Sequence, residues 1–410
     1  MARKTLAPVK PARFLDPASP PTLMTLILIA GLPALGMNIF LPSLAGMALD
    51  FETDYAVMQL AISAYLALTG VLQLFLGPMS DRFGRRPVLL ASFGVFTLAS
   101  VGCALAPTAE IFLMFRMMQA VVASGIALSR AIVRDIVDAR HAASMIGYVT
   151  MGMALVPMIG PSVGGLLDAA FGWRSNFVVL TAFSALVLAI VWFDLGETNS
   201  SQSGSFRDQV KNYPALLASR RFWGYTLVSA FASGAFFAFL GGAPFVAGVV
   251  LGMSPAEMGL YFGMIAGGYA MGNFMTARIA TRMGVAWMLV AGTLVSVFGV
   301  LLGAFLFAMG METPLALFGS IFFVGVGNGL TMPSASSGLL SVRPKLAGTA
   351  SGLGGAIMIG GGAALSAVTG ALLGPETGAW PLIFMMLASS AMSVLAALYT
   401  NWIEKEVAAE

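Results

Sequence analysis

Charged side chains are scarce in this sequence. Only 10% of its 410 residues are Asp, Glu, Lys or Arg, whereas 58% are hydrophobic, and the mean hydropathy is +0.90. A soluble domain needs about a quarter of its residues charged to keep its surface hydrated. The scarcity of charge therefore excludes an ordinary water-soluble globular protein and favours one whose main surroundings are lipid.

Cysteine and histidine are almost absent. The single cysteine, Cys103, excludes an intramolecular disulfide, and together with the sole histidine, His141, it cannot supply a Cys/His metal site. An enzyme buried in a membrane would need a nucleophile with its base, a metal cluster or paired carboxylates inside an apolar segment, and the sequence contains none of these. We therefore expect no catalytic residues, no metal and no cofactor.

The charges are spaced so that long uncharged segments lie between them. A helix needs about 20 mostly apolar residues to cross a hydrocarbon core about 30 Å thick. Charge-free runs cover residues 17–49, 55–80, 87–109, 142–167, 175–193, 222–256, 258–277, 283–311, 313–342, 346–375 and 377–403. A twelfth segment, 111–129, is interrupted by Arg116 alone. These runs predict an all-α membrane protein of twelve transmembrane helices, with both chain ends on one side.

Basic residues are concentrated at the N-terminus and in every second connection between the predicted helices, as in cytoplasmic loops. The residues of these connections are Arg82, Arg85, Arg86, Arg130, Arg134, Arg140, Arg207, Lys211, Arg220, Arg221, Arg278, Arg282, Arg343 and Lys345. The opposite connections carry Asp50, Glu52, Asp54, Glu110, Asp168, Glu257, Glu312 and Glu376, with Arg174 as their single cation. Both termini are therefore expected to be cytoplasmic. The net charge of +3 reflects this orientation and does not indicate nucleic-acid binding.

One long hydrophilic stretch divides six predicted helices from six. The predicted parts are an N-terminal tail 1–21, a six-helix bundle 22–195, a linker 196–221, a second six-helix bundle 222–403 and a tail 404–410. The apolar run that starts the first bundle is much longer than the roughly 7 to 15 residues of a signal peptide, so we expect it to be retained.

The two predicted bundles resemble each other in sequence. Residues 77–90 match 277–290, aligning Gly84 with Gly284, and Trp-x-x-x-Phe at 173–177 recurs at 380–384. Duplicated six-helix halves are the plan of carriers in which a central site opens alternately to either side of the membrane. The sequence thus favours two pseudo-symmetric bundles and a transport function.

Several motifs resemble those of one transporter family. Residues 77–86, GPMSDRFGRR, resemble the loop between helices 2 and 3 of the major facilitator superfamily. Arg116-x-x-Gln119 is similar to its second motif, although Ala120 stands where glycine is usual, and residues 160–165, GPSVGG, resemble its antiporter motif. The segments RAIVRD, GGAPFV and LAGTASGLGGA narrow the resemblance to the Bcr/CflA drug-resistance branch, over essentially the whole chain.

This resemblance implies the major facilitator fold and a multi-pass protein of the bacterial inner membrane. The implied function is export of drug-like small molecules by alternating access, as a proton-coupled antiporter and as a monomer. An importer or uncoupled facilitator of a metabolite on the same fold is the alternative. A channel is disfavoured because the sequence has no ring of charges and no filter-like loop.

The loop after the second predicted helix is expected to form a cytoplasmic gate. Gly84 permits a tight turn, and Asp81 can face Arg85 or Arg134 in charge pairs that exist only when the halves are closed on one side. For Arg82 and Arg86, a role in topology alone is an equal hypothesis. The predicted gate residues are Gly77, Asp81, Arg82, Gly84, Arg85, Arg86, Arg134 and Asp135.

The fifth predicted helix combines prolines with glycines. Each proline removes a backbone donor and bends the helix, and the glycines allow close contact with a neighbouring helix. The pattern predicts a hinge, with ordinary tight packing as the alternative. The hinge residues are Pro157, Gly160, Pro161, Gly164 and Gly165.

Arg116 is the one ionisable residue well inside a predicted helix. It could extend to the outer interface, but it lies on a small and polar helix face with Gln119 and Arg130, which suits a wet cavity. Bcr/CflA carriers place an acidic residue just before the Phe-Leu-Pro of helix 1, where this chain has Asn38. Asparagine cannot titrate, so coupling to protons stays open. With Arg116 as the only buried charge, neutral or anionic substrates are expected.

The family resemblance also suggests which residues line the substrate cavity. Helices 1, 4, 7 and 10 would contribute, with two tyrosines from neighbouring helices. The expected cavity residues are Asn38, Tyr65, Arg116, Gln119, Ser233, Phe236, Phe237, Tyr269 and Asn328. The 27 Met and 29 Phe residues could form adaptable apolar walls, although packing or lipid contact is the default role for any one of them.

Overall fold

A computed structural model describes residues 12–137, 145–146, 148–149, 152–153, 156–199, 213–343 and 346–409. Within these residues all regular structure is helical, which confirms the predicted all-α class. Some predicted features lie outside the described part: the start of the tail 1–21, His141, and residues 200–212 of the linker.

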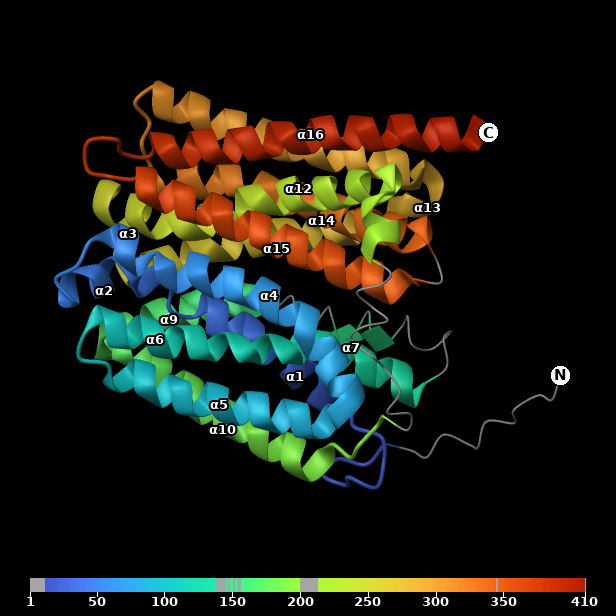
Figure 1. The fold of residues 1–410 in the computed structure, drawn as a ribbon. Helices are drawn as coiled ribbons and strands as arrows, with labels where there is room; N and C mark the ends of the chain where they lie inside the picture. The colour runs from blue at the N-terminus through green and yellow to red at the C-terminus, as the bar shows by residue number, and fades with distance from the viewer. Residues whose placement is uncertain are drawn as a thin grey trace.

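The helices form two groups, which lie one above the other in Figure 1. The N-terminal group comprises α1 Leu23–Asn38, α2 Leu44–Asp50, α3 Tyr55–Met58, α4 Leu60–Phe83, α5 Arg85–Leu105, α6 Ala109–Met118, α7 Ser124–Ile136, α9 Val156–Phe171 and α10 Arg174–Asp194, with 3-10 turns at η1 Leu41–Ser43 and η2 Gln119–Ala123. The C-terminal group comprises α12 Arg220–Phe245, η3 Val246–Val250, α13 Pro255–Ala308, α14 Pro314–Val342, α15 Ala347–Leu372 and α16 Trp380–Ala409. The bounds of the predicted bundles stay a prediction.

Ten helices among the described residues are long and apolar enough to cross a membrane. The predicted helix 142–167 falls partly outside the described residues and continues in α9, whose apolar part Ile159–Phe171 is shorter. The predicted helix 258–277 lies in the first part of α13, which bends at Gly284. The long apolar helices are therefore confirmed, and the total of twelve crossings stays a prediction.

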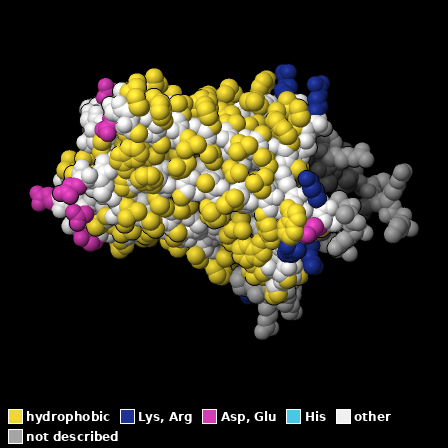
Figure 2. Space-filling view, turned by 90° about the horizontal axis from the view of Figure 1, so that it is seen from above, with side chains coloured by type: hydrophobic (Ala, Val, Ile, Leu, Met, Phe, Trp, Pro, Cys, Tyr) yellow, Lys and Arg dark blue, Asp and Glu magenta, His cyan; other side chains and the backbone are white. Residues whose placement is uncertain are grey.

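Charge of opposite sign marks the two ends of the helix bundle. Figure 2 shows hydrophobic side chains over the middle of one face, with acidic residues at one end and mostly basic residues at the other. We call the end that carries Asp50, Glu52, Asp54, Glu110, Glu257, Glu312 and Glu376 the acidic end. The end that carries Arg82, Arg85, Arg86, Arg134, Arg220, Arg221 and Arg278 is the basic end. An apolar belt between two polar ends is the shape that a bilayer requires of a multi-pass protein.

Glycine allows the helices of each group to pack closely. On α13, an added Cβ at Gly268 or Gly272 would collide with the backbone of α14, and one at Gly325 or Gly329 of α14 would collide with the backbone of α13. In lipid there is little hydrophobic drive between helices, so close backbone contact of this kind contributes much of the stability of the bundle.

The predicted repeat is visible in the backbone and in the aromatic pairs. Gly84 and Gly284 have positive φ angles of 97° and 78°, with extended ψ angles of 153° and 165°. Both residues occupy a region that side chains rarely tolerate, at the start of equivalent helices. The rings of the two Trp-x-x-x-Phe segments also pair in both groups, with centroids 6.0 Å apart in Trp173–Phe177 and 5.6 Å apart in Trp380–Phe384.

Candidate functional site

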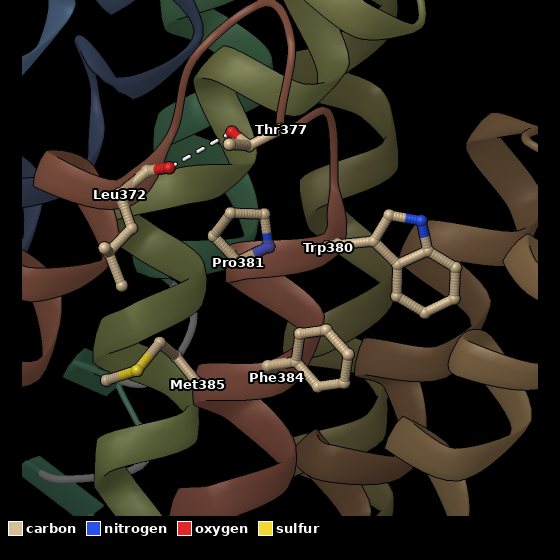
Figure 3. Close-up of a pocket in the computed structure, with 6 residues that line it drawn as sticks. All are labelled: Leu372, Thr377, Trp380, Pro381, Phe384 and Met385. Carbon is tan, nitrogen blue, oxygen red and sulfur yellow. Dashed lines mark hydrogen bonds between the residues drawn. The ribbon is translucent and has the colours of Figure 1, made fainter.

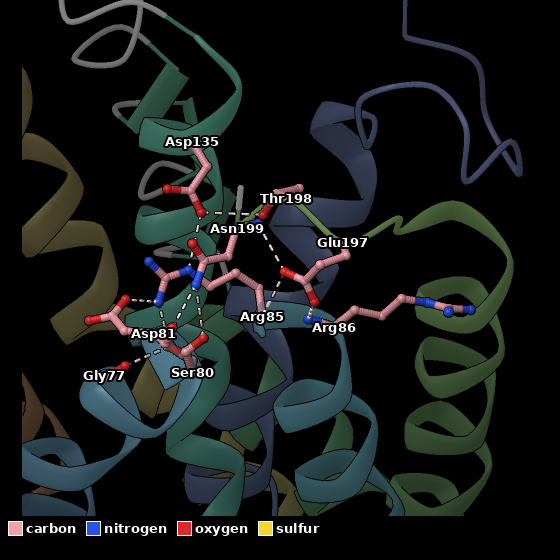
Figure 4. Close-up of polar contacts among 9 residues, drawn as sticks. All are labelled: Gly77, Ser80, Asp81, Arg85, Arg86, Asp135, Glu197, Thr198 and Asn199. Atoms are coloured by element: carbon pink, nitrogen blue, oxygen red, sulfur yellow. Dashed lines mark hydrogen bonds and ion pairs between the residues drawn. The ribbon is translucent and has the colours of Figure 1, made fainter. Parts of the chain in front are cut away.

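A cluster of charged and polar side chains lies at the basic end, where α4 turns into α5 (Figure 4). The Asp81 carboxylate forms an ion pair with the Arg85 guanidinium across the Gly84 turn. Arg85 also donates from Nε to Asp135 Oδ2 of α7 at 3.1 Å and from Nη1 to Ser80 Oγ. Of the two partners predicted for Asp81, the structure selects Arg85.

Residues directly after α10 complete this cluster. Glu197 accepts hydrogen bonds from the backbone N–H groups of Arg85, at 2.9 Å, and Arg86, at 3.2 Å. A carboxylate at this place satisfies free donors and the positive dipole end of α5. Thr198 Oγ1 donates to Asp135 at 3.3 Å, and Asn199 Nδ2 donates to Asp81 O at 2.8 Å. The beginning of the predicted linker is thus bound to the gate motif.

The predicted gate residues divide into two sets. Asp81, Gly84, Arg85 and Asp135 meet in the cluster, and Gly77 O accepts from Ser80 Oγ at 2.7 Å. The side chains of the other arginines point elsewhere. Arg82 lies over the Phe83 ring at 5.3 Å, Arg134 is exposed, and Arg86, whose backbone N–H binds Glu197, directs its guanidinium to Trp192 O at 2.9 Å. Every member of the cluster comes from the N-terminal group, so these pairs do not bridge the two groups. Their dependence on closure stays a prediction.

Arg116 is enclosed within the N-terminal group, with 0% of its side chain exposed. Its Nε donates to Ala61 O at 3.0 Å, and its Nη1 donates to Gly36 O at 3.0 Å and to Gln119 Oε1 at 2.7 Å. The guanidinium also lies over the Tyr65 ring, 3.9 Å from its centroid, in a cation–π contact. In this conformation the helix face that carries Arg116 is turned into its own bundle, and the role of Arg116 in a substrate cavity stays a prediction.

The charge of Arg116 has no carboxylate partner in the described part of the chain. Its Nη2 forms no hydrogen bond there, and its second aromatic neighbour is Phe40, 4.5 Å from ring centroid to guanidinium carbon. A buried cation costs free energy unless it is paired or solvated by dipoles. Carbonyl groups and aromatic faces supply that solvation, so the N-terminal group has a fixed positive charge in its interior.

The other predicted cavity residues of this group are also occupied by contacts inside it. Gln119 is fully buried and donates from Nε2 to Ser100 Oγ at 2.8 Å, which extends the Arg116 network to α5. Tyr65 is 3% exposed beneath the guanidinium. Asn38 donates from Nδ2 to Ala34 O of its own helix at 2.7 Å. Gln119 and Tyr65 are buried inside their own group in this conformation, and their place in a substrate cavity stays a prediction.

The predicted cavity residues of the C-terminal group are mostly buried as well. Asn328 on α14 is 7% exposed, and its Oδ1 forms no hydrogen bond with the described residues. Ser233 on α12 donates to Met332 Sδ of α14 at 3.5 Å, a weak bond. Phe236 and Phe237 pack with their rings 5.6 Å apart, and Tyr269 is half-buried. These residues remain candidates for substrate contact.

The predicted hinge lies where α9 packs against both groups. An added Cβ at Gly164 would collide with Ile39 O, and one at Gly165 would collide with Pro255 O of α13. A Cβ added at Gly160 would lie 3.6 Å from Asn38 Cβ, which is ordinary van der Waals contact. Pro161 lies inside α9. The side chain of Pro157 lies outside the described part. These contacts favour the packing alternative, and hinge bending stays a prediction.

The described contacts between the two groups include several hydrogen bonds near the acidic end. Tyr55 Oη donates to Gly241 O at 2.8 Å, Gln59 Nε2 donates to Ser366 O at 2.7 Å, and Ser162 Oγ donates to Gly259 O at 2.9 Å. The first two join α3 and the residue before α4 to α12 and α15, and the third joins α9 to α13. The groups are thus closed on each other at this end.

A surface hollow of about 430 Å³ lies between the ends of α15 and α16 (Figure 3). Its lining residues are Leu372, Thr377, Trp380, Pro381, Phe384 and Met385. The Thr377 hydroxyl already donates to Leu372 O at 3.1 Å, so the hollow offers a ligand little beyond apolar contact. None of the predicted cavity residues lines it. No group of three His, Cys, Asp or Glu side chains within the described ranges is placed to bind a metal.

Comparison with known proteins gives consistent matches. The family model of the Major Facilitator Superfamily matches residues 26–358. The chain is 31% identical to a chloramphenicol resistance protein of Pseudomonas aeruginosa, covering 87% of this chain and 85% of that protein. It is 29% identical to multidrug resistance protein D of Escherichia coli strain K12, covering 91% and 94%.

Two kinds of solved transporter share the fold. A bacterial homolog of the human lysosomal transporter Spinster, in an inward-facing and unoccupied conformation, superposes with a TM-score of 0.73 at 19% identity over 93% of this chain and 95% of that one. A D-xylose–proton symporter superposes with a TM-score of 0.71 at 17% identity, covering 92% and 96%. At these identities the likeness concerns the fold alone.

Proposed function

The chain belongs to the Major Facilitator Superfamily, and on that basis we propose that it exports drug-like small molecules across the bacterial inner membrane by alternating access. Relatives that match most of its length are named for chloramphenicol and multidrug resistance. The observation that carries the mechanism is the two groups of helices, closed on each other at the acidic end.

We propose twelve membrane crossings with both termini in the cytoplasm. The ten long apolar helices would be joined by α9 and by the part of α13 before Gly284. The basic end would be cytoplasmic, because Lys and Arg accumulate on that side of bacterial membrane proteins. The hydrogen bonds at the acidic end would then close the outer side, and export would require the groups to separate there.

The proposed cavity combines a positive potential with adaptable apolar walls. Arg116 is buried without a carboxylate partner among the described residues, so its charge is poorly screened inside the bundle. A permanent cation approaching the N-terminal group would be repelled, whereas neutral or anionic molecules would not. Substrate contact would fall to Asn328, whose Oδ1 is unpaired among the described residues, and to Ser233, whose bond to Met332 is weak.

A second candidate function is an importer or an uncoupled facilitator. It is favoured by Asn38, which takes the place of the usual helix 1 acid and hydrogen-bonds within its own helix. Without a titratable group at that position, export would need another proton carrier. Drug export remains the first proposal because the named relatives match nearly the whole chain.

Expression in an efflux-deficient bacterium tests the two functions. Cells that carry the protein are challenged with uncharged, anionic and permanently cationic antibiotics, and drug accumulation is measured with and without a protonophore. Protection that the protonophore abolishes supports coupled export. Absence of protection, together with faster entry of a metabolite, would replace export with facilitated uptake.

A further inference from the structure

Gln59, just before α4, places its side chain in the opposite group of helices. Its Nε2 donates to Ser366 O at 2.7 Å and to Ser366 Oγ at 2.8 Å, both on α15. Its Oε1 accepts from Ser63 Oγ of its own helix at 3.2 Å. The side chain is 1% exposed, so the whole amide is buried with both donors and its acceptor used.

The space that receives this amide exists because two residues of the C-terminal group lack a Cβ. A Cβ added at Gly370 of α15 would lie 2.6 Å from Gln59 Cγ, and one added at Gly241 of α12 would lie 2.7 Å from Gln59 Nε2. We call Gly241, Ser366 and Gly370 the Gln59 socket. Contacts of this length cannot coexist with a larger side chain, so the socket fits the amide only as glycines.

Tyr55 contacts the edge of the same socket. Its hydroxyl donates to Gly241 O at 2.8 Å, and its ring lies 5.1 Å from that of Phe245 on α12. Tyr55 and Gln59 are one helical turn apart, so two side chains from one short segment are anchored in the C-terminal group. The segment thus joins the groups at the acidic end by directed bonds as well as apolar contact.

We propose that Gln59 is the positioning residue that holds the outer side of the transporter closed, and that it leaves its socket each time that side opens. This inference rests on the proposed function, which takes the acidic end as the outer side. A neutral amide suits the role because its hydrogen bonds can be exchanged for bonds to water when the groups separate. The socket biases a two-state equilibrium toward closure without fixing it.

The outer opening can be measured directly with spin labels. Cysteines replace Leu49, which is 81% exposed on α2, and the exposed Glu376 that follows α15, in a Cys103→Ser background. Gln59→Ala removes the amide, and Gly370→Ala fills the socket while leaving Gln59 intact. Gly361→Ala on the same helix is the matched control, because an added Cβ there meets nothing within 4 Å.

Both test variants are expected to move the label-to-label distance toward a longer population. Loss of one or two net hydrogen bonds corresponds to an increase of about 5- to 30-fold in the ratio of open to closed molecules. Ser366→Ala removes only one of the two acceptors of the Gln59 amide, so we expect a smaller shift of the label-to-label distance in the same direction. The double variant Gln59→Ala with Gly370→Ala should shift no further than the larger single change, because both remove the same contact.

Parental distance distributions in Gln59→Ala and Gly370→Ala, with normal insertion, would overturn the proposal. Shifts that add in the double variant would also overturn it, because they would come from two independent effects. The distances are recorded without substrate, so this test is separate from the drug assay. If the distances shift but the protein does not export drugs, the proposed function is refuted and the role of Gln59 stands. If the protein exports drugs but the distances do not change, only the role of Gln59 is refuted.

Discussion

Replacing Arg116 tests whether this residue organises the N-terminal group. Arg116→Ala would leave Ala61 O, Gly36 O and Gln119 Oε1 without the donors that they have at 2.7 to 3.0 Å. Hydrogen bonds to a charged group contribute about 1.5–3 kcal/mol each, and a buried partner left unpaired costs comparably. Because the unpaired neutral acceptors can relax, we expect less than the full sum of the three bonds, a fall in the free energy of unfolding of about 3–5 kcal/mol.

A lysine at the same position makes the test more specific. Arg116→Lys keeps the positive charge, but an ammonium group cannot span acceptors on three helices as the planar guanidinium does. We expect it to lose at least one bond, or about 1.5–3 kcal/mol. Transport should be reduced in both variants while membrane insertion is retained.

Thermal unfolding of the purified protein in detergent measures these differences, with transport assayed in parallel. Arg174→Ala is the matched control, because Arg174 is 45% exposed in its ion pair with Asp50 at the acidic end. An exposed pair of this kind contributes at most about 1 kcal/mol. If Arg116→Ala unfolded and transported like the Arg174 control, the enclosed guanidinium would have neither the structural nor the transport role assigned to it.

Three further predictions concern single positions. Asn38→Asp should raise tolerance of cationic compounds in the efflux assay, and an unchanged profile would count against Asn38 facing the transport path. Glu197→Ala should lower the free energy of unfolding by about 0.5–2 kcal/mol, as loss of a helix N-cap does. Glu197→Gln should lower it by less, and thermal unfolding measures both variants. Gly84 has a φ of +97° and lies against the Glu197 carboxylate, so Gly84→Ala should lower the free energy of unfolding by about 1–3 kcal/mol in the same assay. Gly94 has free space around it, so the control Gly94→Ala should leave the free energy of unfolding unchanged or raise it.

The sequence was sufficient to locate the helices, because water and lipid sort residues by charge. Each described long apolar helix coincides with a charge-free run or, for Ala109–Ile136, with the run that Arg116 interrupts. The spacing of charged residues along the chain predicts the helices because it depends on the local sequence alone.

The sequence does not show whether the polar face of a helix lies inside its own bundle or against the space between the two bundles. The stripe of Arg116 and Gln119 was assigned to a wet cavity, but the interior of one bundle and the space between two bundles select similar polar faces. Glu197 was missed because it stands in a polar loop, where an acidic residue is ordinary. Gln59 was missed because its partner is 307 residues away and its socket is defined by absent side chains.

The two repeats differ in the residues that flank their shared turn, and the difference indicates where conformational control lies. The second copy keeps the Gly284 turn and Arg282, but it has Thr281 and Val285 where the first copy has Asp81 and Arg85. The charge pairs across this turn are therefore present only in the first copy, whereas the C-terminal group has its basic-end ion pairs elsewhere, between Arg221 and Glu404 and between Arg220 and Glu406. The bonds that join the groups at the acidic end are made instead by neutral side chains, Tyr55, Gln59 and Ser162. Salt should therefore weaken the ion pairs of the basic end and the exposed Arg174–Asp50 pair, and leave these neutral bonds between the groups largely unchanged, because screening weakens ion pairs more than neutral hydrogen bonds.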